Sequence, residues 1–309
     1  MMKNISDGVY PTMITPFHDD GTIDLPAAGK LLDYYARSGA KGVFAICQSS
    51  EIFKLSFEEM YSLLAFIMEN RPEGLEVIAS GNTSDDPDTI VERAKSFISL
   101  GIDGYVFITN RFASEDEGDD VFLERIFRAV DRIGSDVPFG LYECPYPYKR
   151  VVSPYCMKKL GESGRFAFLK DTCCDIDLIG EKIEACRGTP LKLYNANSAT
   201  LLDSLRLGAA GYSGVMANFH TELYSLLCGV WDKDPALAEK LSAFVGFASV
   251  AECQCYPVNA KYYMDLCGVS MGTYTRVRDR SELTKSRMQE MRQLRELTDF
   301  FKQQLGICL

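Results

Sequence analysis

The chain has 309 residues, of which 47% are hydrophobic and 25% are charged. This composition is that of an ordinary globular protein with ample material for a core, and it excludes a disordered chain, a collagen and a coiled coil. The 33 lysines and arginines against 43 acidic residues give a net charge of -10. Long-range repulsion therefore argues against nucleic acid or an anionic membrane as a partner.

The start of the chain, MMKNISDGVYPTMITPF, contains no apolar run long enough for a signal peptide. Elsewhere no uncharged apolar stretch reaches the length of about 18 residues that a spanning helix needs. We therefore expect a cytoplasmic protein without membrane spans. The 11 cysteines are odd in number and irregularly spaced, which favours reduced thiols over a disulfide framework.

Short apolar runs alternate with amphipathic stretches along most of the chain. The apolar runs predict eight strands, at residues 8–14, 42–46, 76–79, 105–109, 139–142, 166–169, 191–194 and 211–215. The stretches between them predict helices at 24–36, from about 56, from about 87, at 120–133, from about 153, at 178–186 and at 198–207. Strands separated by helices predict a parallel sheet, because each crossover has to cover one face of the sheet.

Eight such units favour a closed (β/α)8 TIM barrel over an open, doubly wound sheet. An open sheet that binds a dinucleotide would need a glycine-rich turn after its first strand, where this chain has PFHDDGTI. From Leu223 onward the pattern is helical, with long amphipathic stretches at 234–251 and 283–305. We expect a barrel catalytic domain at 1–222 and a helical region at 223–309 that packs on the barrel or at a subunit contact.

In such a barrel the chemistry lies where strands end and loops begin. Lys170 directly follows the run 166–169, so its stem would cross an apolar wall and its amine would lie in the barrel mouth. Desolvation would lower the pKa of that amine, and a partly neutral amine can form a Schiff base with a ketone. The alternative is a strand-end lysine paired with Asp171 or Asp175.

Tyr142 ends the preceding predicted strand. Neighbouring strands lie about 5 Å apart, so its phenol could exchange protons with a carbinolamine on Lys170. The alternative is a packed aromatic residue. The sequence CQSSE at 47–51 follows the second strand, and its hydroxyls and amides could hold a carboxylate, although by itself it is only a polar turn.

Other reactive residues carry weaker hypotheses. Four cysteines follow predicted strand ends and could line one mouth: Cys47, Cys144, Cys173 and Cys174. Their spacing matches no zinc motif, so packed or redox-sensitive thiols are the preferred interpretation. His18, in a turn, is interpreted as solvated. His220, after the last strand, could touch the mouth of the barrel but is interpreted as structural. The basic run at 276–285 is interpreted as a solvated face or a subunit contact.

Taken together, these residues resemble the pyruvate-dependent class I lyases that include dihydrodipicolinate synthase and N-acetylneuraminate lyase. The segments that match follow the family's order: GVYPTMITPFHDDGTID, GVFAICQSSEIFKLSFEE, GIDGYVFIT, FGLYECPYP, FAFLKDTCCD and GAAGYSGVMANF. The resemblance implies the barrel, a homo-oligomer (a tetramer or dimer), and a covalent Schiff base on the protein with no metal or organic cofactor. It gives Lys170 the role of the Schiff-base amine and Tyr142 that of the proton shuttle.

The resemblance also places three substrate-binding positions. Ser49 matches the second hydroxyl of the family's turn, which contacts the keto-acid carboxylate. Ser213 matches a position whose backbone lies near the bound keto acid. Gln48 stands where the family has the first hydroxyl of the turn, and Cys47 and Ser50 replace its glycines. We expect Gln48, Ser49 and nearby amides to hold the carboxylate.

Two departures argue against dihydrodipicolinate synthesis itself. The segment 110–112, Asn-Arg-Phe, lacks the tyrosine that completes the family's proton relay across a subunit contact. Pro147 occupies the place of the arginine that binds the aldehyde's carboxylate, and proline cannot replace a guanidinium. Arg111 is one hypothetical replacement, and Lys149 and Arg150 lie nearby.

The leading hypothesis is a Schiff-base lyase or aldolase that acts on pyruvate or a related 2-oxo acid plus an aldehyde. The second hypothesis is a dehydratase or aldolase of a deoxy sugar acid. The third is not an enzyme but a keto-acid-binding sensor that retains Lys170, since the CQSSE turn departs from the family pattern.

Overall fold

The computed structural model describes residues 3–307. Its eight strands are β1 (Gly8–Val9), β2 (Gly42–Ile46), β3 (Glu76–Ala79), β4 (Gly104–Ile108), β5 (Phe139–Tyr142), β6 (Phe166–Asp171), β7 (Leu193–Asn195) and β8 (Gly211–Tyr212). They form one parallel sheet in the order β1-β8-β7-β6-β5-β4-β3-β2. A parallel bridge between Thr12 and Phe44 joins the two ends of the sheet. The predicted (β/α)8 TIM barrel is confirmed.

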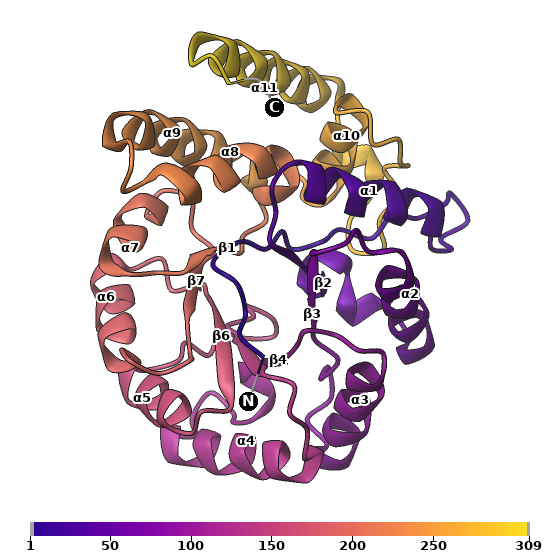
Figure 1. Cartoon of the computed structure of the whole chain (residues 1–309). Coiled ribbons are helices and arrows are strands. Elements are labelled where there is room, and N and C mark those ends of the chain that lie inside the picture. The colour runs from indigo at the N-terminus through magenta and orange to yellow at the C-terminus, as the bar shows by residue number, and fades with distance from the viewer. Residues whose placement is uncertain (1–2, 308–309) are drawn as a thin grey trace.

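Helices surround the strands in a ring, which Figure 1 shows. These helices are α1 (Leu25–Arg37), α2 (Phe57–Asn70), α3 (Pro87–Ser99), α4 (Asp119–Ile133), α5 (Pro154–Glu162), α6 (Ile176–Ala185), α7 (Leu201–Leu207) and α8 (Ala217–Val230). Most begin at caps visible in the sequence. The Asp24 side chain accepts the Ala27 amide, and Ser56 forms a capping box with Glu59. Such caps satisfy amides that have no partner within the helix.

The seam of the barrel differs from the prediction. The run at 8–14 pairs as a strand only at 8–9, followed by the bridge at Thr12, because Pro11 has no amide to donate. The last strand is likewise shorter than the predicted run at 211–215. At this seam a Cβ atom on Gly211 would lie 1.9 Å from the Gly8 carbonyl oxygen. Glycine at 211 therefore lets β8 approach β1.

Aromatic side chains fill the interior of the barrel. The rings of Phe168 and Tyr194 stack with centroids 4.3 Å apart, and Tyr10 packs edge-on against both. All three side chains are buried. Because the interior is a packed core rather than a pore, a ligand can enter only at a mouth of the barrel.

Three further helices follow the ring: α9 (Pro235–Ala248), α10 (Val258–Leu266) and α11 (Lys285–Gln304). They gather beyond α1 and α8 at one side of the barrel (Figure 1). The expected division after residue 222 falls inside α8, and the division into two parts stays a prediction. Within residues 3–307, every helix is too short or too polar to cross a membrane.

His220 lies inside α8, where it is fully buried. Its Nδ1 atom lies 3.3 Å from the Tyr263 hydroxyl, and Nε2 has no hydrogen-bond partner among the described residues. Burial lowers the pKa of His220 to about 3. The histidine is therefore neutral at physiological pH, as a structural role requires.

This burial predicts a specific pH dependence of stability. Between pH 6.5 and about 3 the unfolded chain binds a proton at position 220 that the folded protein does not, so the free energy of unfolding falls as pH falls. When the pH is lowered from 7 to 5, the free energy of unfolding should fall by about 2 kcal/mol less in His220→Gln than in the unchanged protein. This figure follows from about 1.4 kcal/mol per pKa unit. Urea unfolding at both pH values measures this. The exposed His18→Gln is the control, and an equal loss in all three proteins would contradict the prediction.

Candidate active site

Lys170 and Tyr142 lie side by side near the carboxyl ends of β6 and β5. The parallel register pairs the two residues directly. Lys170 is only 4% exposed, and its Nζ atom lies 4.2 Å from the centroid of the Tyr142 ring. Burial lowers the pKa of Lys170 below the usual lysine value, because the ammonium ion loses hydration in the barrel. The fold thus brings together the two residues that the sequence predicts to be catalytic.

The Tyr142 hydroxyl reaches the turn that follows β2. It donates a hydrogen bond to Gln48 Oε1 at 3.1 Å. Its ring packs edge-on against Phe44, with the centroids 5.6 Å apart. Burial raises the pKa of the phenol well above its ordinary value, so the hydroxyl keeps its proton at neutral pH and acts as a hydrogen-bond donor.

The turn itself is a short 3-10 helix, η1 (Gln48–Ser50). The Ser50 hydroxyl is used within it, since it donates to the Cys47 carbonyl at 2.7 Å and accepts the Cys47 amide at 2.8 Å. Ser49 instead donates to Thr12 Oγ1 at 3.0 Å. Gln48 and Ser49 both line the adjacent pocket, where a carboxylate could reach them.

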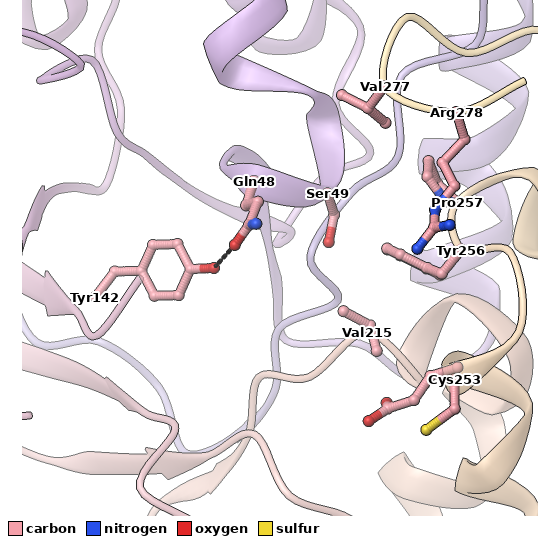
Figure 2. A pocket seen from close by; sticks show the side chains of 10 residues that line it. Gln48, Ser49, Tyr142, Val215, Cys253, Tyr256, Pro257, Val277 and Arg278 are labelled. Carbon is pink, nitrogen blue, oxygen red and sulfur yellow. Dashed lines mark hydrogen bonds between the residues drawn. The ribbon is translucent and has the colours of Figure 1, made fainter. Parts of the chain in front are cut away.

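A pocket of about 450 Å³ opens at this mouth of the barrel. Its walls are formed by Gln48, Ser49, Tyr142, Val215, Glu252, Cys253, Tyr256, Pro257, Val277 and Arg278. Figure 2 shows Tyr142 at one side, the turn with Gln48 and Ser49 next to it, and Arg278 at the opposite side. The barrel therefore supplies one wall, and the segments around α10 supply the other.

The pocket wall formed by the segments around α10 is the part of the site that the sequence does not predict. Glu252 is close enough to Lys170 for their charges to interact, and burial raises the pKa of its carboxyl. Arg278 belongs to the basic run that is interpreted as a solvated face or a subunit contact, yet it lines the pocket. No local pattern indicates this, because the segment is irregular and meets the barrel only through tertiary packing.

Ser213 lies next to the barrel seam rather than in the pocket wall. Its amide donates to the Asn195 carbonyl at 2.9 Å, and its hydroxyl donates to the Tyr10 carbonyl at 2.9 Å. Both polar groups are therefore used within the barrel. The pocket residue of this loop is Val215. A substrate contact of Ser213 stays a prediction.

Comparison with known proteins decides the family. The chain matches the Dihydrodipicolinate synthetase family over residues 5–296. The chain belongs to this family. It is 26% identical over 266 residues to 4-hydroxy-tetrahydrodipicolinate synthase of Prochlorococcus marinus strain NATL2A, which covers 84% of this chain and 85% of the relative. It is 25% identical over 272 residues to the enzyme of the same name from Methanococcus maripaludis, covering 86% and 90%.

Solved structures of the dihydrodipicolinate synthetase family share the fold. YagE, a prophage protein of E. coli K12 solved in complex with pyruvate, superposes with a TM-score of 0.84 at 21% identity, covering 98% of this chain and 99% of YagE. CdNal from Clostridium difficile, solved in complex with mannosamine, gives a TM-score of 0.82 at 17% identity, covering 93% and 98%. The predicted family is confirmed, and its members are lyases of the class I aldolase type.

The cations considered as replacements for the family's arginine lie outside the pocket wall. Arg111 pairs with Asp85 at 3.0 Å and lies over the Phe53 ring, 5.5 Å from its centroid. Arg150 donates to the Glu117 carbonyl at 2.9 Å, and Lys149 donates to the Thr172 carbonyl at 2.8 Å. Each of these cations therefore forms contacts between loops. The arginine that lines the pocket is Arg278.

A buried ionic cluster lies directly behind the two reactive residues. Lys182 of α6 contacts Glu143 Oε1 at 2.6 Å and Asp171 Oδ2 at 2.5 Å, and all three side chains are fully buried. Glu143 follows Tyr142, and Asp171 follows Lys170. Because strand residues alternate in direction, the acids point outward under α6 while their neighbours point into the barrel. Asp171 thus pairs with Lys182 rather than with Lys170, and Asp175 caps α6.

The cysteines do not form a metal centre in the described part of the chain. Cys47 and Cys144 are fully buried near Lys170, whereas Cys173 is half-buried and Cys174 is exposed. Between residues 3 and 307, no group of three or more His, Cys, Asp and Glu side chains is placed to hold a metal ion. Burial raises the pKa of the Cys47 and Cys144 thiols, which favours the packed interpretation for that pair.

Proposed function

We propose that the protein is a Schiff-base-forming lyase or aldolase that acts on pyruvate or a related 2-oxo acid together with an aldehyde. The observation that carries this proposal is the buried Lys170 amine, 4.2 Å from the Tyr142 ring, whose hydroxyl reaches the pocket turn. The pyruvate complex of the E. coli neighbour supports the choice of 2-oxo acid. Pro147, in place of an arginine, argues against dihydrodipicolinate synthesis itself.

The geometry supports the following sequence of steps. The neutral Lys170 amine adds to the keto carbon, and Tyr142 donates the proton with which the carbinolamine oxygen leaves as water. The resulting iminium takes up an electron pair from the neighbouring carbon after a proton is lost there, which gives an enamine. The enamine forms a carbon–carbon bond to the aldehyde, and water then releases the product from Lys170. The reverse order of steps cleaves the same bond.

The carboxylate of the 2-oxo acid would lie against the turn that follows β2. The Gln48 side-chain amide and the Ser49 hydroxyl line the pocket beside Tyr142 and offer hydrogen-bond donors. No metal is needed in these steps, because the protonated lysine nitrogen itself acts as the electron sink. The family resemblance adds a homo-oligomer and a cytoplasmic location, which gel filtration and fractionation would test.

Borohydride trapping tests the proposed function. The protein is incubated with pyruvate and sodium borohydride, and the modified peptide is identified by mass spectrometry. The expected result is a stable adduct on Lys170. An adduct only with longer 2-oxo acids would redirect the substrate towards a deoxy sugar acid. An adduct without turnover on any aldehyde would favour a sensor, and no adduct with any 2-oxo acid would refute the proposal.

The proton role of Tyr142 predicts a separate kinetic effect. Tyr142→Phe keeps the ring against Lys170 and Phe44 but removes the hydroxyl that contacts Gln48. Positioned proton transfer contributes about 10²- to 10⁴-fold to a rate, so adduct formation should slow by at least about 10²-fold. Time-resolved trapping measures this. An unchanged trapping rate in a correctly folded variant would show that Tyr142 is a packing residue.

A further inference from the structure

The pocket is larger than a small 2-oxo acid requires. Pyruvate has six non-hydrogen atoms, and it occupies less than about 180 Å³ even if each atom is given the roughly 30 Å³ that a water molecule takes in the liquid. The pocket encloses about 450 Å³. More than half of it is therefore available for the second substrate, and the charges on its walls bear on what that substrate is.

Two charged side chains, those of Glu252 and Arg278, line the pocket. Glu252 lines the pocket within range of the charge on Lys170. Arg278 extends into the pocket from the side opposite Tyr142 (Figure 2). Close to Lys170, the carboxylate of the 2-oxo acid would be held by the donors of Gln48 and Ser49, and a second anionic group there would be repelled by an ionised Glu252. An anionic group at the far end would instead meet a guanidinium.

The pocket wall that carries Arg278 is anchored to the turn that contains Gln48 and Ser49. Glu51, which follows η1, has a fully buried side chain that pairs with Lys261 at 3.2 Å. The same carboxylate accepts the Val277 amide at 3.1 Å. The Arg278 amide donates to Thr275 Oγ1 at 3.0 Å, and Thr275 Oγ1 donates back to the Arg278 carbonyl at 2.7 Å. The backbone that carries Arg278 is thus held at a set position relative to Gln48 and Ser49.

The Arg278 guanidinium has capacity for a ligand. Its side chain is 46% exposed, and its Nη1 atom contacts Glu282 at 2.9 Å, four residues along the chain. An exposed pair of this kind contributes at most about 1 kcal/mol, so an incoming anion can compete with it. The remaining donors of the guanidinium suit the two oxygens of a carboxylate or a phosphate.

We propose that Arg278 binds an anionic group at the end of the aldehyde substrate that lies away from the reacting carbon. The substrate class is then an aldehyde with a terminal carboxylate or phosphate, and the condensed product is a 2-oxo acid with an anionic group at each end. This inference rests on the proposed function, because it takes Lys170 as the point of attachment.

The test compares Arg278→Gln with the unchanged protein in the trapping of 2-oxo acids whose tails differ in charge. Concentration dependence of borohydride trapping is measured with pyruvate, 2-oxohexanoate, 2-oxoadipate and a phosphorylated 2-oxo sugar acid. Arg280→Gln is the control, because Arg280 is an exposed arginine two residues away that pairs with Asp19. We expect Arg278→Gln to raise the half-saturating concentration at least about 10-fold for the acid with the preferred anionic tail. Pyruvate and 2-oxohexanoate should be unaffected, and Arg280→Gln should match the unchanged protein.

The outcomes separate this inference from the proposed function. A loss confined to 2-oxoadipate identifies a carboxylate tail, and a loss confined to the phosphorylated acid identifies a phosphate tail. Equal values for Arg278→Gln and the unchanged protein on every acid would overturn the role of Arg278 while leaving the Schiff base intact. An equal loss on 2-oxohexanoate would also overturn it, since the effect would then not depend on charge. Absence of trapping with every acid in the unchanged protein would refute the proposed function itself.

Discussion

Replacement of Lys170 by arginine is expected to abolish adduct formation and to lower turnover by at least about 10³-fold. Arginine keeps a long cationic side chain, but its guanidinium stays protonated and cannot add to a ketone. The substitution also keeps a cation beside the Tyr142 ring, which Lys170 Nζ approaches to 4.2 Å. The loss would therefore report chemistry rather than the removal of a charge.

The control for this variant is Lys149→Arg. Lys149 lies in the loop after β5 and donates to the Thr172 carbonyl, so it is a lysine close to the site that is not buried in the barrel. Trapping with pyruvate and turnover on the preferred aldehyde are measured for both variants, with circular dichroism to verify folding. Retention of the adduct in Lys170→Arg would place the Schiff base elsewhere, and the proposed mechanism would be withdrawn.

The sequence predicts the barrel because its signals are local. Each buried strand is a short apolar run, and the first turn of several helices carries its own cap, as at Asp24 and Ser56. The positions of Lys170 and Tyr142 follow from the same pattern, since both stand at the ends of such runs. Their pairing then follows from the order of the strands, because consecutive strands of a parallel barrel are neighbours.

The parts that the sequence does not predict depend on contacts between distant segments. Glu51 and Lys261 are 210 residues apart, and only the folded chain shows that this pair fixes the far wall of the pocket. Arg278 stands in an irregular segment without periodicity, so its pattern indicates no more than a solvated face. The shortened first strand is a different case, because its cause, Pro11, stands within the run at 8–14 and is visible in the sequence.

The cluster of Lys182, Glu143 and Asp171 belongs to the same group of unpredicted contacts, and it predicts a large effect on stability. Lys182→Met should lower the free energy of unfolding by about 3 to 5 kcal/mol, because it leaves two carboxylates buried without a cation. Total stabilities of domains are about 5 to 15 kcal/mol, so the variant should fold but unfold at much lower urea concentration.

The pH dependence of this variant distinguishes unpaired charge from lost packing. Burial, together with the Asp171 carboxylate, raises the pKa of Glu143 even while Lys182 is present. Without Lys182 the folded protein should bind a proton there more tightly than the unfolded chain does. The stability of Lys182→Met is then greatest at low pH and is lost as pH rises through the raised pKa. Its deficit relative to the unchanged protein should therefore be smaller at pH 5 than at pH 7.

A triple variant completes this test. Lys182→Met combined with Glu143→Gln and Asp171→Asn removes all three charges at similar volume, and it should recover part of the loss at pH 7, since neutral amides cost less to bury than carboxylates. Urea unfolding at pH 5 and pH 7 gives the free energy of unfolding of the unchanged protein, of Lys182→Met and of the triple variant. If Lys182→Met lost less than about 1 kcal/mol, or if its deficit were the same at both pH values, the cluster would not be the ionic support that its burial implies. A deficit that shrinks at low pH and in the triple variant would instead show that charge pairing behind β5 and β6 stabilises the two strands that carry Tyr142 and Lys170.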